Sequence, residues 1–202
     1  MFITFEGIDG SGKSTQARLL SERLKSQGRD VILTREPGGA PGAEDIRKLL
    51  VEGDPGRWSA ETEILLFTAA RRDHMERTIR PALERGAVVI SDRFADSTRV
   101  YQGAARSNLR DTVDTLHSLM IGIEPTVTLI LDTDPDAALT RGLARKSGED
   151  RFEDMGLSFQ HALRKGFRQL ADSAPERCIL IDGDRPIETV AADVAAQIEP
   201  ML

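Results

Sequence analysis

Residues 7–14 read Gly-Ile-Asp-Gly-Ser-Gly-Lys-Ser and fit the spacing G-x-x-x-x-G-K-[ST] of a phosphate-binding loop. The glycines let successive backbone N–H groups curve around phosphate oxygens without a clash from Cβ. Lys13 is placed to reach the β- and γ-phosphates of a nucleotide, and the hydroxyl of Ser14 can ligate Mg²⁺. The predicted contacts of this loop with a nucleotide are Gly7, Ile8, Asp9, Gly10, Ser11, Gly12, Lys13, Ser14 and Thr15.

The residues around this loop are those that a phosphate site needs. Residues 1–5 form a short apolar run that favours a buried strand, and the pattern turns helical from Lys13 onward. One face of that helix carries Ala17, Leu20 and Leu24. A phosphate held by the loop would lie at a helix N-terminus, where the helix dipole attracts an anion. Strand, loop and helix occur in the required order, which argues against a chance glycine-rich turn.

Length, composition and charge narrow the class of protein. The 202 residues are 40% hydrophobic and 30% charged, which predicts one globular domain over residues 1–202. A net charge of −6 disfavours a protein that grips long nucleic acids. No apolar stretch approaches the ~20 residues of a membrane span and no signal-peptide pattern is present, so we expect a cytoplasmic protein. The single cysteine, Cys178, excludes an intrachain disulfide and lies in an apolar run that predicts a buried strand thiol.

Strand-like and helix-like segments alternate along the whole chain. Short runs rich in Val, Ile and Leu predict strands buried on both faces at residues 2–6, 30–34, 87–91, 126–132 and 178–182. Helix ends are marked by Gly28 and Gly86, and helix starts by Asp134–Pro135 and Pro186. This order predicts an α/β fold, with a doubly wound five-stranded parallel sheet, helices on both faces and a phosphate-binding loop after the first strand. The irregular stretches are 35–42, 53–58 and 146–152.

Polar residues follow the second and third predicted strands, and ligands of such folds bind beyond the carboxyl ends of strands. The sequence Arg35-Glu-Pro-Gly-Gly39 predicts either a plain turn or a loop that shapes an acceptor pocket. Asp92 follows the third strand, where a carboxylate can serve Mg²⁺ directly or through water. Arg93 beside it can clamp a phosphate. The alternative for Asp92 is the cap of the next helix.

Two helical segments offer groups that can hold a planar base and a sugar. In the stretch from about 59 to 85, Phe67 and Arg71 lie one turn apart, so a ring and a guanidinium can grip a base. The plainer interpretation of this pair is a core phenylalanine beside a solvated arginine. Residues 97–103, Ser-Thr-Arg-Val-Tyr-Gln-Gly, supply hydroxyls and an amide for base-edge and sugar contacts, or form a solvated helix face.

A basic segment from about 141 to 153 predicts a short lid over a transferring phosphoryl group. Arg141, Arg145, Lys146 and Arg151 carry positive charge around a flexible centre. Phosphoryl transfer needs such charge and the exclusion of water. The variable positions of the phosphate-binding loop supply no cation beyond its lysine, so a lid arginine would fill that gap. The alternative is a solvated basic surface.

Taken in order, these segments resemble the thymidylate kinase family of nucleoside monophosphate kinases. The matching segments are Phe5–Thr15, Arg35–Gly39, Leu66–Phe67 with Ala70–Arg71, Asp92–Arg93, Ser97–Thr98 with Tyr101–Gly103, and Asp150–Glu153. The phosphate-binding loop alone is generic, whereas Arg-Glu-Pro-Gly-Gly together with Asp-Arg…Tyr-Gln-Gly is specific. The resemblance implies Mg²⁺-dependent transfer of the γ-phosphoryl group of ATP to dTMP, giving dTDP and ADP for dTTP synthesis. It also implies a homodimer.

On the acceptor side, the resemblance implies contacts with the base. Phe67 would stack on thymine, Arg71 would bond its O4 edge, and Thr98 would read its N3 side. Tyr101 would press on the sugar where a 2′-hydroxyl would sit, which favours deoxyribose. The full set of implied dTMP contacts is Asp9, Glu36, Pro37, Phe67, Arg71, Arg93, Ser97, Thr98, Tyr101 and Gln102.

The resemblance also implies how the phosphates are held. Arg93, with the Glu36–Pro37 loop, would position the acceptor phosphate, and Asp9 would face the acceptor's sugar or phosphate. Arg141 would lie against the donor adenine. The implied catalytic cations are Lys13, Arg93, Arg145 and Arg151, with the choice among Arg145, Lys146 and Arg151 left open. The implied Mg²⁺ ligands, direct or through water, are Ser14, Asp92 and Glu153.

Three rival functions make different demands on the sequence. A kinase of another small acceptor would keep the same loop and differ only in the acceptor pocket. A GTP-dependent switch would need an Asn-Lys-x-Asp motif, which the sequence lacks. A silent nucleotide-binding protein is disfavoured by the intact loop and by Asp92 and Arg93, and turnover separates it from an enzyme. No chemistry is assigned to the three histidines, His74, His117 and His161.

Overall fold

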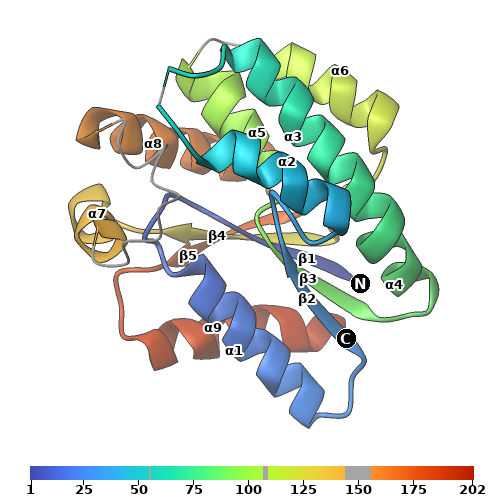
Figure 1. Cartoon of the computed structure of the whole chain (residues 1–202). Coiled ribbons are helices and arrows are strands. Elements are labelled where there is room, and N and C mark those ends of the chain that lie inside the picture. The colour runs from blue at the N-terminus through green and yellow to red at the C-terminus, as the bar shows by residue number, and fades with distance from the viewer. Residues whose placement is uncertain (55, 107–108, 144–155) are drawn as a thin grey trace.

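In the computed structural model, the described residues (1–54, 56–106, 109–143 and 156–202) form a five-stranded parallel sheet flanked by helices (Figure 1). The strands are β1 (Phe2–Glu6), β2 (Val31–Arg35), β3 (Val88–Asp92), β4 (Val127–Asp132) and β5 (Cys178–Asp182). Their order is β2-β3-β1-β4-β5, so the chain winds to one side of β1 and then to the other. The segment after β1 therefore lies where ligands of open α/β sheets bind. All five predicted strands are confirmed to within one residue at either end.

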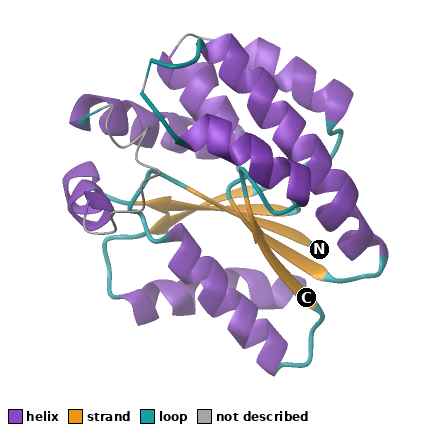
Figure 2. Ribbon diagram, viewed as in Figure 1, coloured by secondary structure: helices purple, strands orange, loops and turns teal. Residues whose placement is uncertain are grey.

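Helices cover both faces of the sheet (Figure 2). On one face lie α1 (Lys13–Ser26) and α9 (Ile187–Ile198), which contact each other. The other face carries α2 (Pro41–Val51), α3 (Ala60–His74), α4 (Arg80–Glu84), α5 (Ala95–Thr98), α6 (Arg110–Met120) and α8 (Leu157–Ser173). The remaining elements are α7 (Pro135–Leu143), the π-helical segments η1 (Met75–Ile79) and η2 (Arg99–Arg106), and the closing turn η4 (Glu199–Met201). No helix within the described residues is long and apolar enough to span a bilayer.

The strands bury side chains on both faces, which explains their lack of strict alternation. Ile3 and Phe5 pack into the layer with α1 and α9, whereas Phe2 points to the opposite layer. There its ring meets that of Phe94 edge to face, with centroids 4.9 Å apart. Cys178 is buried in β5, and burial raises the pKa of its thiol to about 12. The prediction of a buried strand thiol is confirmed.

The stretch predicted as one helix from about 59 to 85 is helical but not uniform. It begins at Ser59, whose hydroxyl accepts a hydrogen bond from the Thr62 N–H at 3.2 Å, and runs through α3, η1 and α4. Pro81 in α4 has no N–H for the carbonyl four residues earlier, and the π-helical segment η1 comes just before it. Ile64 in α3 and Ile79 in η1 are both buried.

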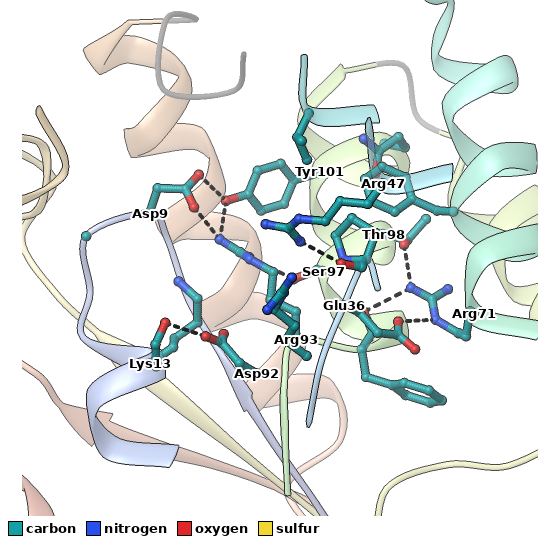
Figure 3. Close-up of a pocket in the computed structure, with 18 of the residues that line it drawn as sticks. Asp9, Lys13, Glu36, Arg47, Arg71, Asp92, Arg93, Ser97, Thr98 and Tyr101 are labelled. Atoms are coloured by element: carbon teal, nitrogen blue, oxygen red, sulfur yellow. Dashed lines mark hydrogen bonds and ion pairs between the residues drawn. The ribbon is translucent and has the colours of Figure 1, made fainter. Parts of the chain in front are cut away.

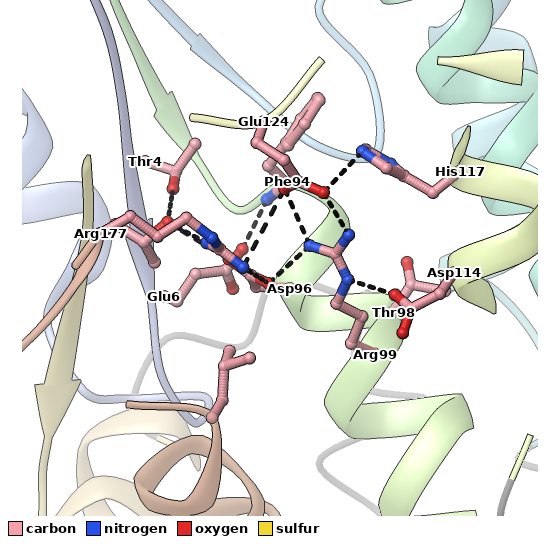
Figure 4. Close-up of polar contacts among 12 residues, drawn as sticks. Thr4, Glu6, Phe94, Asp96, Thr98, Arg99, Asp114, His117, Glu124 and Arg177 are labelled. Atoms are coloured by element: carbon pink, nitrogen blue, oxygen red, sulfur yellow. Dashed lines mark hydrogen bonds and ion pairs between the residues drawn. The ribbon is translucent and has the colours of Figure 1, made fainter. Parts of the chain in front are cut away.

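A buried network of ion pairs fixes α5 and η2 to the sheet (Figure 4). The carboxylate of Asp96 is 1% exposed and accepts hydrogen bonds from Arg177 at 2.6 and 3.0 Å. Arg99 donates to the same carboxylate at 2.8 Å and also pairs with Asp114 and Glu124. Burial alone would raise the pKa of Asp96, but the two arginines outweigh burial and lower it. The network holds in place the short helix that carries several predicted acceptor contacts.

Candidate active site

The predicted phosphate-binding loop connects β1 to α1 and lines a pocket (Figure 3). Gly7, Gly10 and Gly12 have φ angles of 134°, 78° and 95°, a region that side chains with Cβ rarely adopt. A Cβ on Gly10 would lie 1.9 Å from the carbonyl oxygen of Ala138 in α7. All three glycines are therefore required by their backbone conformation, and Gly10 is required by close packing as well.

Lys13 begins α1 and is largely buried beneath the loop. Its Nζ donates a hydrogen bond to the carbonyl oxygen of Ile8 at 2.6 Å. Burial, together with the charge of Arg93, lowers the pKa of Lys13 to about 8. The lysine is thus held where the loop closes, at the position predicted for contact with the phosphates of a nucleotide.

Ser14 and Asp92 bring a hydroxyl and a carboxylate together at the mouth of the loop. The Ser14 hydroxyl donates to Oδ2 of Asp92, at the end of β3, over 2.5 Å. Hard oxygen ligands of this kind suit Mg²⁺. The described residues contain no cluster of three or more His, Cys, Asp or Glu with metal-binding geometry. Magnesium usually binds one or two carboxylates together with substrate phosphates, so the donor set fits Mg²⁺ carried by a nucleotide.

Arg93 occupies the centre of the pocket. Its Nη1 donates to the Gly7 carbonyl at 3.2 Å and to the Ser97 hydroxyl at 2.8 Å. Its Nη2 donates to Asp9 at 2.5 Å and to the Tyr101 hydroxyl at 3.1 Å. Burial alone would raise the pKa of Asp9, but the charges of Arg93 and Lys13 outweigh it and lower that pKa. The arginine therefore links the phosphate-binding loop to α5 and η2.

The side of the pocket that is predicted to take the acceptor is organised around Arg71 in α3. This side chain is 3% exposed, and its Nε donates to Glu36 at 2.7 Å. Its Nη2 donates to Thr98 at 3.0 Å and to the Phe94 carbonyl at 3.2 Å. Nη1 has no hydrogen-bond partner among the described residues. The interpretation of Arg71 as a solvated arginine is wrong, because Glu36, from the loop after β2, draws it into the protein.

The sequence analysis missed one residue of this side, His74, and the partner of another, Gln102. The His74 ring bonds to the second oxygen of Glu36 at 3.1 Å and to the Thr34 hydroxyl at 2.7 Å. Its position one turn after Arg71 was the available signal. The amide of Gln102 donates to Glu63 at 2.9 Å, whereas its buried Oε1 has no hydrogen-bond partner among the described residues. A buried amide oxygen without a donor is an unmet requirement that a ligand can satisfy.

The structure gathers most of the predicted site residues into one pocket. Those that line it are Asp9, Gly10, Gly12, Lys13, Ser14, Glu36, Pro37, Phe67, Arg71, Asp92, Arg93, Ser97, Thr98, Tyr101 and Gln102. Unpredicted lining residues are Arg35, Arg47, Val51 and Phe94. Gly7, Ile8 and Ser11 belong to the loop itself, whereas Thr15 lines a groove between α1 and α9. Arg141 lies in α7, and Arg145, Lys146, Arg151 and Glu153 lie outside the described residues.

A parallel sheet of this order, with a phosphate-binding loop after its central strand and a basic pocket beside the loop, defines a P-loop nucleotide-binding protein. The family model of thymidylate kinases matches residues 5–194. Thymidylate kinase of Dinoroseobacter shibae is 70% identical over 97% of this chain and 95% of its own length. Thymidylate kinase of Ruegeria pomeroyi is 64% identical over 96% of this chain and 92% of its own length.

A solved structure gives the same result for the fold. The crystal structure of thymidylate kinase from Ehrlichia chaffeensis matches with a TM-score of 0.79 at 38% identity, over 98% of each chain. The chain belongs to the thymidylate kinase family. It is therefore a kinase, a phosphotransferase of nucleotide biosynthesis.

Proposed function

We propose that the chain transfers the γ-phosphoryl group of ATP to the 5′-phosphate of dTMP, giving dTDP and ADP. The observation that carries this proposal is a buried, hydrogen-bonded Arg71 that lines the same pocket as the phosphate-binding loop. A phosphate site and a base site thus lie side by side. Family membership supports the same reaction, because the relatives at 70% and 64% identity are thymidylate kinases.

The pocket presents a hydrogen-bonding pattern that suits thymine. The Nη1 of Arg71 is a donor for O4 of the base, whereas cytosine has an amino group at that position. The unpartnered Oε1 of Gln102, with the hydroxyl of Thr98, offers an acceptor for the N3–H of thymine. Phe67 lines the same pocket and supplies a ring for stacking. Left unpaired, these buried groups would penalise cytosine strongly.

Tyr101 is suited to select deoxyribose. Its hydroxyl donates to Asp9 at 2.9 Å and accepts from Arg93 at 3.1 Å, so the hydroxyl end of the ring is fixed. Phe159 and Phe167 make edge-to-face contacts with the ring, with centroids 6.0 and 6.3 Å away, and these contacts restrict its movement. A ring that cannot move leaves little room for a 2′-hydroxyl.

Catalysis in this proposal consists of positioning and charge stabilisation. The attacking oxygen belongs to a phosphate and is already anionic, so no strong general base is required. Lys13 holds the β- and γ-phosphates of the donor and Arg93 holds the acceptor phosphate, so the two groups meet in line. A lid arginine, Arg145 or Arg151, would add charge over the transferring group, and Arg141 would lie against the adenine.

Ser14 and Asp92 would hold Mg²⁺ on the donor phosphates, with Glu153 as a further candidate. Magnesium, when bound, neutralises charge on the β- and γ-phosphates. Loss of the Asp92 carboxylate would remove an anchor for the ion and also a hydrogen bond to Ser14.

The chain is further proposed to act as a cytoplasmic homodimer. Exposed apolar side chains lie on two neighbouring helices, with Leu65 of α3 59% exposed and Leu119 of α6 71% exposed. Apolar surface of this kind is typical of an interface between subunits. Size-exclusion chromatography with light scattering tests this assignment directly, and a monomer at working concentration would contradict it.

The test of the proposed activity is ADP release from Mg·ATP with dTMP, dUMP, dCMP, dGMP or dAMP as the only acceptor. We expect strong turnover with dTMP, weaker turnover with dUMP and little with the others. One methyl group in an apolar pocket changes kcat/KM by about 10- to 200-fold, and this limits the preference for dTMP over dUMP. Preferred turnover of another acceptor would keep the phosphate chemistry and overturn the assignment of the base pocket. No turnover at all would favour a silent nucleotide-binding protein.

A further inference from the structure

Glu6 joins the phosphate-binding loop to the acceptor side of the site. It is the last residue of β1, directly before Gly7, and is fully buried. One carboxylate oxygen accepts the backbone N–H of Phe94 at 2.8 Å (Figure 4), and the other accepts the Ser97 hydroxyl at 2.5 Å. Both donors belong to the segment after β3. A single carboxylate therefore ties the start of the donor loop to the segment that carries Arg93.

The contact continues from Ser97 to Arg93 (Figure 3). The Ser97 oxygen accepts from Nη1 of Arg93 at 2.8 Å. A serine hydroxyl has one proton, and giving it to Glu6 leaves the oxygen lone pairs for the guanidinium. An ionised Glu6 thus sets the direction of the whole chain of hydrogen bonds. A protonated or amide group at this position would compete for the same serine oxygen.

The charge of Glu6 is costly to bury. No Lys, Arg or His of the described residues forms an ion pair with it. Burial raises its pKa to about 7, Asp96 of α5 adds to the rise, and Arg93 opposes it. Lys13 of α1 and Cys178 of β5 also face it electrostatically. Glutamine would fill the same space without the cost of burying a charge, so a carboxylate at this position points to a functional requirement.

We propose that Glu6 is a positioning residue for phosphoryl transfer, which acts through Ser97 to fix the guanidinium of Arg93 relative to the phosphate-binding loop. This inference rests on the proposed function, because it assigns Arg93 to the acceptor phosphate. It concerns binding of the acceptor rather than of ATP. Glu6 itself does not contact the reacting atoms.

The first test is the pH profile of Glu6→Gln beside that of the wild type. The ratio of wild-type to variant kcat/KM for dTMP should rise about tenfold between pH 6 and pH 8, as the Glu6 carboxyl ionises. Titration of the dTMP phosphate affects both enzymes equally and cancels in the ratio. KM for dTMP should increase in the variant at pH 8, and it should increase more than KM for ATP. A ratio independent of pH, or an equal change in both KM values, would overturn the proposal.

The second test asks whether Glu6 acts through Ser97. Glu6→Gln should cost little further activity in a Ser97→Ala background, because the shared path is already broken. Additive losses in the double variant would contradict the inference. Thermal unfolding of all variants checks that they fold. Turnover of dTMP by the wild type is measured first. If dTMP is not turned over, the proposed function is rejected. The ratio of wild-type to variant kcat/KM is then measured with the acceptor that the wild type does use.

Discussion

The two halves of the pocket, proposed to take the donor and the acceptor, are built in different ways. The donor half is one contiguous segment, residues 7–14, whose glycine φ angles create a backbone cradle. The acceptor half is assembled from side chains of separate elements, with Arg71 of α3 bonded to Glu36 after β2 and to Thr98 of α5. A backbone cradle recognises phosphate whatever nucleoside carries it, whereas a set of side chains recognises one base. Donor and acceptor specificity can therefore change independently.

The largest expected effect is on the donor half. Lys13→Ala should lower kcat by about a thousandfold or more with every acceptor, because it removes the charge on the transferring phosphates. The measurement is ADP release with each acceptor at saturation. The matched control is Lys48→Ala, an exposed lysine of α2 paired only with Asp45 within the described residues. If Lys13→Ala were nearly as active as the control, the assignment of residues 7–14 as the phosphate-binding loop would be wrong.

The next effect is on the acceptor half and should depend on the acceptor. Arg71→Gln should lower kcat/KM for dTMP about a hundredfold, since it removes charged hydrogen bonds to the base, and should leave KM for ATP nearly unchanged. The preference for dTMP over dCMP should shrink at the same time. In Arg71→Gln the buried carboxylate of Glu36 is left without its cation. The double variant Glu36→Gln/Arg71→Gln removes that charge, so it should be more stable than Arg71→Gln but no more active. An unchanged preference among acceptors would contradict the comparison.

A smaller effect separates the two halves by pH. Burial lowers the pKa of Lys13 to about 8, whereas the pKa of Arg93, despite its burial, is raised by Tyr101 and Asp9. Lys13 therefore loses its proton as pH rises through about 8, while Arg93 stays charged. ATP should bind up to about tenfold more weakly at pH 9 than at pH 7, and dTMP should bind almost equally at both. Calorimetric titration of each ligand alone measures this, and a parallel loss for dTMP would argue against it.

The smallest expected effect on activity comes from the closed ion network behind the site. Asp96→Asn should lower the free energy of unfolding by about 3 kcal/mol, because Arg177 and Arg99 lose a buried anionic partner. Its KM values should stay within about threefold of the wild type, since Asp96 does not line the pocket. Chemical denaturation beside steady-state kinetics tests both statements. A large loss of dTMP affinity in a stable variant would show that the network belongs to the site.

The sequence predicted the elements that depend on local pattern. It missed the roles of side chains whose partners are distant in sequence. The strands and the phosphate-binding loop follow from apolar runs and glycine spacing, and the structure confirms them. Arg71 is ambiguous in sequence because its partner Glu36 lies 35 positions away. His74 was passed over for the same reason, since its role depends on the same carboxylate.

Glu6 illustrates the limit most clearly. In sequence it is the last residue of a strand, and an acidic residue there usually faces solvent. Only the folded chain brings it within 2.8 Å of the Phe94 N–H, which is 88 positions away. The family resemblance predicted most of the pocket residues. A family's motifs include residues that are distant in sequence but meet in the folded chain.

Arg93 has a positive φ of 70°, a left-handed conformation that costs a non-glycine residue about 1 to 3 kcal/mol. Glycine at this position would relax the backbone while deleting the guanidinium at the centre of the pocket. The residue that would make the fold more stable at this position is therefore not the residue that the proposed catalysis needs. Directed evolution of this enzyme for heat resistance alone would favour inactive variants here, so such a screen must select for turnover at every round.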